Sequence, residues 1–357
     1  GAGAVYLNIF HYDVEEFLDT KKVNADEDLR LSTISTGLIV PSKFFDLAKE
    51  GKDFHMFAPH TVYKEYGVTL DDINLDEYYD ELVANPNVDK KKKDAREMLN
   101  MIAQTQLQSG YPYLMFKDNA NKVHANSDIG QIKMSNLCTE IFQLQETSII
   151  NDYGTEDEIK RDISCNLGSL NIVNVMESGK FKDSVHTGMD ALTVVSDEAD
   201  IQNAPGVRKA NRELHSVGLG VMNLHGYLAK NKIGYESEEA KDFANIFFMM
   251  MNYYSIERSM EIAKERQEVY KDFEKSDYAN GKYFEFYTTQ NFEAKYEKVR
   301  KLFEGFEVPT AEDWKALQKE VEAHGLFHAY RLAIAPTQSI SYVQNATSSV
   351  MPIVDQI

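Results

Sequence analysis

Two cysteines stand in segments whose neighbouring residues could do chemistry together with a thiol. The first, Cys138, lies in residues 135–140, which read Ser-Asn-Leu-Cys-Thr-Glu. In an extended strand or at a hairpin tip, Asn136, Cys138 and Glu140 would share one face because side chains alternate. An amide, a thiol and a carboxylate on one face can bind a polyol, carry a hydrogen atom or an electron, and take a proton from a hydroxyl. A loop with an incidental cysteine has the same spacing, so both interpretations stay open at this point.

The second cysteine, Cys165, lies in residues 162–171, whose alternating character predicts a strand. Gly168 in this strand permits close approach of a ligand or of a neighbouring backbone. Cys165 is too far from Cys138 in the sequence for a CxxC redox pair, but the chain between them is long enough to return to a neighbouring strand. Two cysteines are too few for a disulfide scaffold or a structural zinc site. A pair of inert buried thiols and a redox or radical role both remain open.

A third segment, residues 335–341, reads Ala-Pro-Thr-Gln-Ser-Ile-Ser. Pro336 ends an apolar run that predicts a strand, and hydroxyl and amide side chains follow it. A strand that leads into a turn with hydroxyls and free N–H groups is a plausible phosphate cradle. Many plain turns also carry Ser or Thr after Pro, so this segment is a weak signal by itself.

The elements that must position these segments follow from hydrophobic periodicity. Lysines 90–93 are expected to form the solvated first turn of a helix. The alternation of strand and helix patterns indicates an α/β architecture with a mainly parallel sheet. The predicted strands span residues 5–9, 33–40, 111–116, 163–172 and 332–335, and the predicted helices include 13–19, 41–49, 184–201 and 217–229.

Two further helices carry clear end signals. One runs from about Ser237 to Arg266, because Ser237 is a good N-cap and carboxylates follow it in the first turn. The other begins with a capping box of Thr310 and Asp313 and ends before Gly325.

Composition narrows the classes of partner. The 357 residues include 38 Lys+Arg against 57 Asp+Glu, so the net charge is −19 and nucleic acid is an unsuitable partner. A mononucleotide could still bind where backbone N–H groups converge. Apolar runs of membrane-spanning length and a signal-peptide pattern are absent, so we expect a cytoplasmic protein without a membrane partner. The nine histidines show no HExxH motif, and we expect no metal in this chain.

The length suits one large domain, and no linker rich in Pro, Gly and Ser interrupts it. We therefore expect residues 1–357 to form a single domain. The sequence begins with Gly-Ala-Gly-Ala rather than Met and ends without a helix-ending or tail signal. These ends predict a domain that is truncated on both sides.

Taken together, the three segments resemble the large (alpha) subunit of class I ribonucleotide reductases, most closely the Ib branch. The resemblance implies the ten-stranded α/β barrel of these enzymes, with Cys138 on a central finger loop. It covers nearly the whole chain and is carried by residues 1–8, 17–21, 109–113, 135–140, 163–171, 218–227 and 336–342.

The resemblance implies reduction of ribonucleoside diphosphates to 2′-deoxyribonucleoside diphosphates by a thiyl radical. Cys138 would hold the radical that removes the 3′ hydrogen, and Glu140 would take the 3′-hydroxyl proton. Asn136 would hydrogen-bond the ribose hydroxyls, and Cys165 would be one of two thiols that reduce the intermediate. The substrate-binding residues would be Asn136, Leu137, Cys138, Thr139, Glu140, Gly168, Pro336, Thr337, Gln338, Ser339 and Ile340.

The family's pattern has Gly where Gln338 stands, which is a problem only if that position needs a positive φ. Residues 21–30 resemble the loop that couples a nucleotide effector to substrate choice, and a solvated turn is the alternative. Its effector residues would be Lys21, Lys22, Asn24, Asp28 and Arg30.

The resemblance also implies partners. These are a small subunit that generates the radical with a di-iron or di-manganese centre, a thioredoxin- or glutaredoxin-like reductant, dNTP and ATP effectors, the remaining large-subunit segments and a second copy of the full large subunit. The second reducing cysteine, a radical-relaying tyrosine pair and a C-terminal cysteine pair would lie outside this sequence. An inactive nucleotide-binding or assembly module is therefore the alternative function, and a glycyl-radical or adenosylcobalamin reductase is a weaker one.

Overall fold

The computed structural model describes residues 3–24 and 27–353 of the chain. The chain folds as two compact units. Unit 1 comprises Gly1–His124 and Ile132–Phe142, and unit 2 comprises Ala125–Gln131 and Gln143–Ile357. The expected single domain over residues 1–357 stays a prediction.

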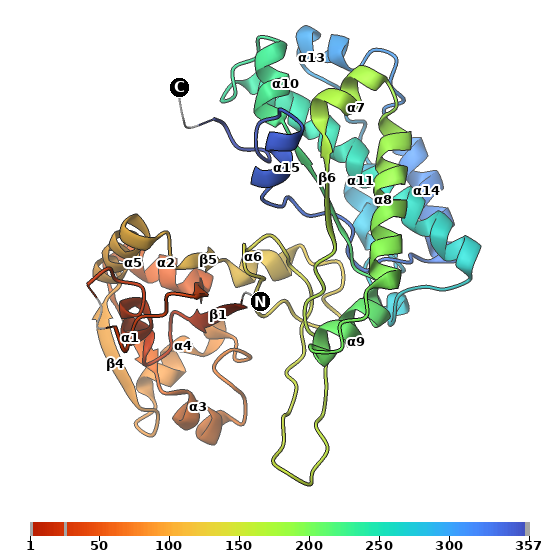
Figure 1. Cartoon of the computed structure of the whole chain (residues 1–357). Helices are drawn as coiled ribbons and strands as arrows, with labels where there is room; N and C mark the ends of the chain where they lie inside the picture. Colours follow the sequence, from red (N-terminus) through yellow and green to blue (C-terminus); the bar gives the residue numbers. More distant parts are fainter. Residues whose placement is uncertain (1–2, 25–26, 354–357) are drawn as a thin grey trace. The chain divides into compact units, whose positions relative to one another are not determined.

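Unit 1 is built on a three-stranded parallel sheet in the order β1 (Gly3–Asn8), β2 (Ile34–Ile39) and β5 (Tyr113–Met115). These strands confirm three of the predicted ones to within a few residues. A two-stranded antiparallel sheet of β3 (Asp53–Phe57) and β4 (Lys90–Asp94) belongs to the same unit (Figure 1). Its helices are α1 (Val14–Asp19), α2 (Ser42–Glu50), α3 (Pro59–Tyr66), α4 (Leu75–Ala84), α5 (Ala95–Ser109) and α6 (Lys117–Lys122).

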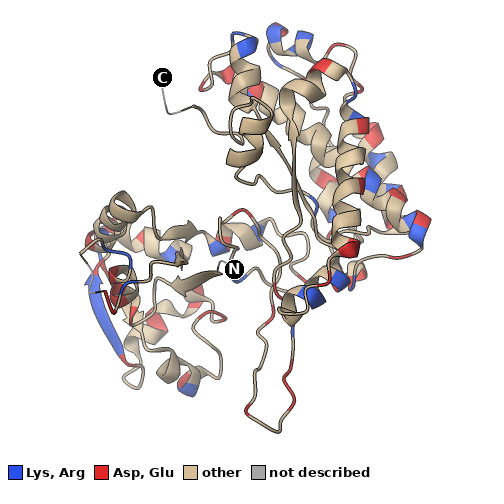
Figure 2. Cartoon of the chain, in the orientation of Figure 1, with Lys and Arg blue, Asp and Glu red and all other residues tan. Residues whose placement is uncertain are grey.

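The lysine run at residues 90–93 forms β4, so its prediction as the first turn of a helix was wrong. Figure 2 shows this strand as a continuous stretch of basic residues. Its cations meet carboxylates, with Lys93 Nζ 2.7 Å from Glu15 and Lys92 Nζ 2.9 Å from Asp53. Helix α5 begins only afterwards, where the Asp94 side chain accepts hydrogen bonds from two backbone N–H groups of the first turn. Lysines are suited to an exposed strand at the edge of a sheet, since their charge discourages pairing with another chain.

Unit 2 contains the parallel pair β6 (Leu167–Asn171) and β7 (Gly218–Met222). Residues 331–335 run beside β7, where Leu219 N donates to Arg331 O at 2.8 Å and Ala333 N donates to Leu219 O at 3.2 Å. The predicted strand 332–335 is therefore reduced to one parallel bridge between Leu219 and Leu332. Gly220 allows this close approach, because a Cβ there would lie 2.2 Å from Ala333 O.

The predicted helix 217–229 is wrong in its first half, which forms β7. The chain turns at Asn223, with φ +72°, and α10 (Leu224–Lys230) follows. An apolar run without polar residues at helical spacing does not distinguish a buried strand from a buried helix. All five residues of β7 are buried.

One long helix, α8 (Phe181–Glu198), packs against both strands of this pair. Helix α11 (Glu238–Arg266) packs against α8 and α14 (Ala311–His324). The predicted caps are confirmed: Ser237 Oγ accepts from Ala240 N at 3.1 Å, and Thr310 with Asp313 forms the capping box. The remaining helices are α7 (Ile172–Ser178), α9 (Pro205–Leu214), η1 (Phe273–Lys275), η2 (Lys282–Phe284), α12 (Glu285–Thr288), α13 (Glu297–Leu302) and α15 (Gln338–Val343).

The mixed helix and strand content confirms the predicted α/β class. The strands of the described residues form sheets of three, two and two, and these sheets do not close into a barrel. None of the helices in the described residues is both long enough and apolar enough to cross a membrane.

Candidate active site

The first predicted segment is a turn rather than a strand, so the argument from side-chain alternation was wrong. Asn136 Oδ1 accepts hydrogen bonds from Glu140 N at 3.0 Å and from Ile141 N at 3.1 Å. Thr139 adopts φ +66° within the turn. An Asn side chain that accepts backbone N–H groups offers the chain an alternative to strand pairing. The turn nevertheless brings Asn136, Cys138 and Glu140 together within five residues of chain.

Tyr6 of β1 holds this turn, and sequence reasoning missed it. Its hydroxyl donates to Asn136 O at 2.8 Å and lies 2.7 Å from Thr139 Oγ1. Gly37 of β2 makes room for the ring, because a Cβ there would lie 2.2 Å from Tyr6 Cε1. Tyr6 and Asn136 are 130 residues apart in the sequence, so no local pattern could have linked them.

The electrostatics of the turn favour a protonated thiol. Cys138 is exposed, but partial desolvation of its thiol raises the pKa, and the neighbouring Glu140 carboxylate raises it further. Burial also raises the pKa of Tyr6 and of Tyr113, so both phenols stay neutral around physiological pH. Glu140 Oε2 is buried and has no hydrogen-bond partner among the described residues. A buried carboxylate oxygen without a partner is costly and suits a ligand that brings a hydroxyl.

Cys165 precedes β6 in unit 2, between two buried polar neighbours. Ser164 and Asn166 are 1% and 8% exposed, whereas the Cys165 side chain is exposed. The predicted strand thus begins later, at Leu167. Gly168 gives close approach to a helix, because its missing Cβ would lie 3.3 Å from Leu192 Cδ2 of α8.

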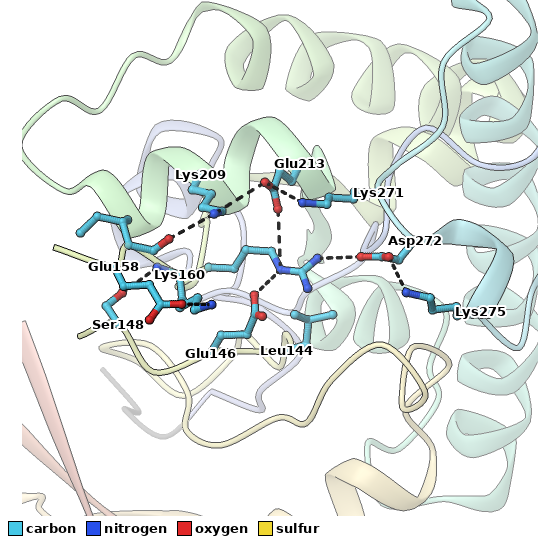
Figure 3. Close-up of polar contacts among 12 residues, drawn as sticks. Leu144, Glu146, Ser148, Glu158, Lys160, Lys209, Glu213, Lys271, Asp272 and Lys275 are labelled. Atoms are coloured by element: carbon cyan, nitrogen blue, oxygen red, sulfur yellow. Dashed lines mark hydrogen bonds and ion pairs between the residues drawn. The ribbon is translucent and has the colours of Figure 1, made fainter. Parts of the chain in front are cut away.

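An ion-pair network fixes the chain just before Cys165. Arg161 Nε donates to Glu146 Oε2 at 2.5 Å, and its Nη1 lies 3.5 Å from Asp272 Oδ2. Figure 3 shows how Glu146, Glu213 and Asp272 converge on one centre from separate segments of unit 2. Burial opposes the charge of Arg161, but these carboxylates raise the pKa of the guanidinium above its ordinary value. Residues 146 and 161 are the two ends of a loop that precedes Cys165. Arg161 connects these ends to Glu213 of α9 and to Asp272, which follows α11.

The predicted phosphate segment begins a helix. Thr337 precedes α15 and is buried, and its Oγ1 accepts from Ser349 N at 2.7 Å, so this hydroxyl serves the fold. Gln338 lies in α15 and is not among the residues with positive φ, so a non-glycine residue is unstrained there. Pro336, Gln338, Ser339 and Ile340 are exposed.

Asn223 anchors the chain that follows α15. Its Oδ1 accepts from Thr347 N at 3.0 Å, and its Nδ2 donates to Asn171 Oδ1 at 3.0 Å. Asn171 Nδ2 in turn donates to Gln344 Oε1 at 3.2 Å. Two strand ends, those of β6 and β7, thereby hold the returning chain.

Strand register separates Cys165 from Pro336. Cys165 precedes the first residue of β6, whereas Pro336 follows residues 331–335, which run parallel to β7. Cys165 and Pro336 thus lie at opposite ends of these parallel strands. Cys138 belongs to unit 1 and Cys165 to unit 2, so the convergence of the two thiols stays a prediction.

The predicted effector loop is anchored rather than fully solvated. Lys21 is 7% exposed, and its ammonium donates to the carbonyls of Leu31 and Ile34. The same ammonium lies 4.4 Å from the centroid of the Tyr111 ring. A solvated turn, the alternative interpretation, is therefore wrong for Lys21.

A cavity of about 710 Å³ in unit 1 borders this loop. Lys22, Asn24 and Leu29 contribute to its lining, together with α1. Asp28 and Arg30 are exposed and are not among its lining residues. Residues 25–26, within the predicted loop, lie outside the described residues.

Among the described residues, one group has the composition of a metal site: His186 of α8 with Glu257 and Glu261 of α11. Glu257 Oε2 lies 2.9 Å from His186 Nε2 and 2.8 Å from Lys182 Nζ. Arg258 Nη1 lies 2.9 Å from Glu261 Oε2. Because both carboxylates already have cationic partners, an ion-pair network between two helices accounts for the group. The expectation of no metal in this chain stays a prediction.

Comparisons with known proteins identify the family of the chain. A sequence model of the family described as ribonucleotide reductase, barrel domain, matches residues 1–357. The ribonucleoside-diphosphate reductase subunit alpha of Bacillus subtilis (strain 168) is 56% identical over 357 residues, which cover 100% of this chain and 51% of that protein. Proteins of the same name from Mycoplasma pneumoniae and Mycoplasma genitalium are each 43% identical over 363 residues and are each covered to 50%. The chain thus spans about half the length of these curated relatives. Because the family match extends over every residue of the sequence, this chain belongs to the ribonucleotide reductase barrel-domain family.

Proposed function

We propose that this chain supplies the thiyl-radical site of a ribonucleoside-diphosphate reductase alpha subunit. The observation that carries the proposal is the turn of Asn136, Cys138 and Glu140, where a thiol with a raised pKa stands beside a buried carboxylate oxygen without a partner. A hydrogen-atom carrier must rest as a thiol rather than a thiolate. The raised pKa meets this requirement at neutral pH.

The chemistry proposed for the turn follows from these groups. The Cys138 thiyl radical takes the 3′ hydrogen atom of the ribose while the Glu140 carboxylate takes the 3′-hydroxyl proton. Asn136 Oδ1 already accepts two hydrogen bonds within the turn, so we expect Asn136 Nδ2 to donate to a ribose hydroxyl. The 2′-hydroxyl then leaves as water, and Cys138 later returns its hydrogen atom to C3′.

Cys165 and a second thiol from the rest of the alpha subunit supply the reduction. The two thiols give up two electrons and two protons and become a disulfide, while the C2′–OH bond is replaced by C2′–H and water. The exposure of Cys165 in this chain suits a thiol that must reach a substrate and later a thioredoxin- or glutaredoxin-like reductant. The radical itself is supplied by a separate di-iron or di-manganese subunit.

The substrate diphosphate is assigned to residues 336–340. Pro336, Gln338, Ser339 and Ile340 are exposed and can meet a ligand, whereas the Thr337 hydroxyl is taken by Ser349 N. Because Cys165 and Pro336 lie at opposite ends of the strands, a bound nucleotide would extend along them.

Regulation and assembly complete the proposal. The cavity beside Lys22 and Asn24 borders the loop that would respond to a dNTP or ATP effector. We expect the full alpha subunit to form a homodimer in the cytoplasm. The alternative function, nucleotide binding without turnover, is what we expect of the isolated chain, because it spans about half the length of its relatives.

The test uses a full-length alpha subunit that contains this chain, combined with a radical-generating subunit and a dithiol. We expect CDP to become dCDP, and Cys138→Ala to consume no CDP. Cys165→Ala should still consume CDP, because its thiol acts only after the 3′ C–H bond breaks. If the wild-type complex forms no dCDP, or if Cys138→Ala retains turnover, the proposed function is wrong.

A further inference from the structure

One side-chain oxygen in unit 2 collects three hydrogen bonds around Cys165. Asn211 Oδ1, on α9, accepts from Ser164 Oγ at 2.8 Å, from Asn166 Nδ2 at 2.8 Å and from Ser196 Oγ at 2.9 Å. Asn211 is 3% exposed, and its Nδ2 donates to Ser196 O at 2.8 Å. The amide is therefore held from both ends, and it cannot flip without losing several bonds.

Two of these three donors are the residues on either side of Cys165. Ser164 and Asn166 both turn inward to the same oxygen, and the residue between them is exposed. In extended chain, fixing residues i−1 and i+1 on one side directs residue i to the other. Asn211 thereby determines the direction in which the Cys165 side chain leaves the backbone.

The residues next to Cys165 are fixed by three further hydrogen bonds. Gln143 Nε2 donates to Ser164 O at 2.8 Å, and Ser164 N donates to Gln143 Oε1 at 3.1 Å. Asn166 Nδ2 also donates to Ser216 O at 3.0 Å, just before β7. Buried side-chain networks that are satisfied in this way specify one local conformation.

We propose that Asn211 is a positioning residue for the Cys165 thiol. Asn211 does not touch the substrate; it acts through Ser164 and Asn166, whose bonds to its oxygen aim the thiol. This inference rests on the proposed function, because it concerns the reductive step in which Cys165 takes part.

The consequence for the reaction follows from the order of steps. The thiol of Cys165 is needed only after the 3′ hydrogen has been removed and the 2′-hydroxyl has left as water. With a misdirected thiol, the C2′ radical of the 3′-ketonic sugar would take back the hydrogen atom held by Cys138. The resulting 3′-keto-2′-deoxynucleotide would stay unreduced and lose its base and its diphosphate by β-elimination. CDP would then be consumed without forming dCDP.

The first experiment introduces Asn211→Ala into the full-length alpha subunit with its radical-generating partner and measures CDP consumed per dCDP formed, together with free cytosine. The wild-type ratio is expected near unity. Because a displacement of about 1 Å can cost ~10²-fold in rate, we expect the variant's ratio to rise by ~10-fold or more. A loss of both CDP consumption and dCDP formation in parallel would mean that Asn211 supports the fold alone, and the inference would be wrong.

A matched pair of variants keeps the inference testable if Asn211→Ala does not fold. Ser164→Ala and Ser196→Ala each remove one buried hydroxyl that donates to Asn211 Oδ1 at 2.8 and 2.9 Å. Only Ser164 adjoins Cys165. We expect Ser164→Ala to raise the ratio of CDP consumed to dCDP formed several-fold and Ser196→Ala to leave it unchanged.

The two variants decide the inference separately from the proposed function. Equal ratios in Ser164→Ala and Ser196→Ala would overturn the positioning role of Asn211, while wild-type dCDP formation would leave the proposed function intact. A wild-type complex that consumes no CDP would instead remove the proposed function on which the inference rests.

Discussion

At the scale of single residues, hydrogen bonds to one amide oxygen close the turn that contains Asn136, Cys138 and Glu140. The spacing of Asn136, Cys138 and Glu140 was enough to group an amide, a thiol and a carboxylate. Alternation along a strand was the wrong reason, because Asn136 Oδ1 accepts two backbone N–H groups and closes a turn. Thr139, a β-branched residue at φ +66°, could not be anticipated from local propensity, since that conformation costs roughly 1–2 kcal/mol.

The protonated state of Cys138 depends on its neighbour. The Glu140 carboxylate raises the pKa of the thiol in addition to the effect of partial desolvation. Glu140→Gln removes the charge and keeps the size of the side chain, so we expect the pKa of Cys138 to fall while remaining above its ordinary value. The pH dependence of Cys138 alkylation, followed by mass spectrometry, should move to lower pH. An unchanged or higher midpoint would contradict the effect assigned to Glu140.

Tyr6 is predicted to stabilise the turn through its hydroxyl alone. Tyr6→Phe keeps the ring in the space left by Gly37 but loses the bonds to Asn136 O and Thr139 Oγ1. Each lost bond costs about 0.5–1.5 kcal/mol, so the free energy of unfolding should fall by about 1–2 kcal/mol. Urea denaturation of the full-length subunit measures this change. Tyr12→Phe, in the chain just after β1, is the control and should leave the curve unaltered.

At the scale of elements, the predictions of secondary structure were confirmed where helix caps and hydrophobic periodicity agreed. They were wrong where a run of residues was uniformly apolar or uniformly charged. Helices α11 and α14 carried explicit cap residues and were confirmed. Strand β7 was assigned to a helix because all its residues are buried, which removes the alternation that marks a strand. Strand β4 was missed because its lysines pair with carboxylates from other elements. The sequence next to the lysines does not reveal these partners.

Asn223 is predicted to hold the chain that returns from α15. Asn223→Gly keeps the φ of +72° without strain and removes the bonds to Thr347 N and Asn171. The backbone amide of Thr347 should then exchange with solvent faster, by about 10-fold for each 1.4 kcal/mol lost in local stability. Hydrogen exchange read by mass spectrometry on peptides covering residues 337–350 tests this. Protection equal to the wild-type level would show that the loop is held by other contacts.

At the scale of the whole molecule, the alternation of strand and helix patterns correctly indicated an α/β protein, but the division of the chain into two units could not be predicted. The chain passes between the units at residues 124–125, 131–132 and 142–143. These crossings lack the Pro-, Gly- and Ser-rich composition of a linker, so nothing in the sequence marks them. The turn of Cys138 and the segment of Cys165 belong to different units.

The ion-pair network around Arg161 predicts how unit 2 responds to acid. Burial raises the pKa of Glu146, but the hydrogen bond and charge of Arg161 outweigh it and hold that pKa below its ordinary value. Lys275 and, to a lesser degree, Arg161 lower the pKa of Asp272 as well. A carboxyl whose folded pKa is depressed adds stability above its unfolded pKa, near 4, and this stability is lost as the pH falls through the folded value.

Arg161→Met should therefore lower the free energy of unfolding at pH 7 and flatten its dependence on pH below about 5. Arg161 is buried but Glu146 is partly solvated, so the loss at pH 7 should be about 1–3 kcal/mol, below that of a fully buried pair. Urea denaturation of the full-length subunit at pH 7, 5 and 4 measures both effects. Lys301→Met, which removes the cation of the exposed pair with Glu297 in α13, is the matched control and should leave the pH dependence of the wild type intact. If Arg161→Met and the wild type lost stability equally between pH 7 and pH 4, the depressed carboxyls would not be linked to Arg161. The chain before Cys165 would then be held by the Asn211 network and the Gln143 contacts.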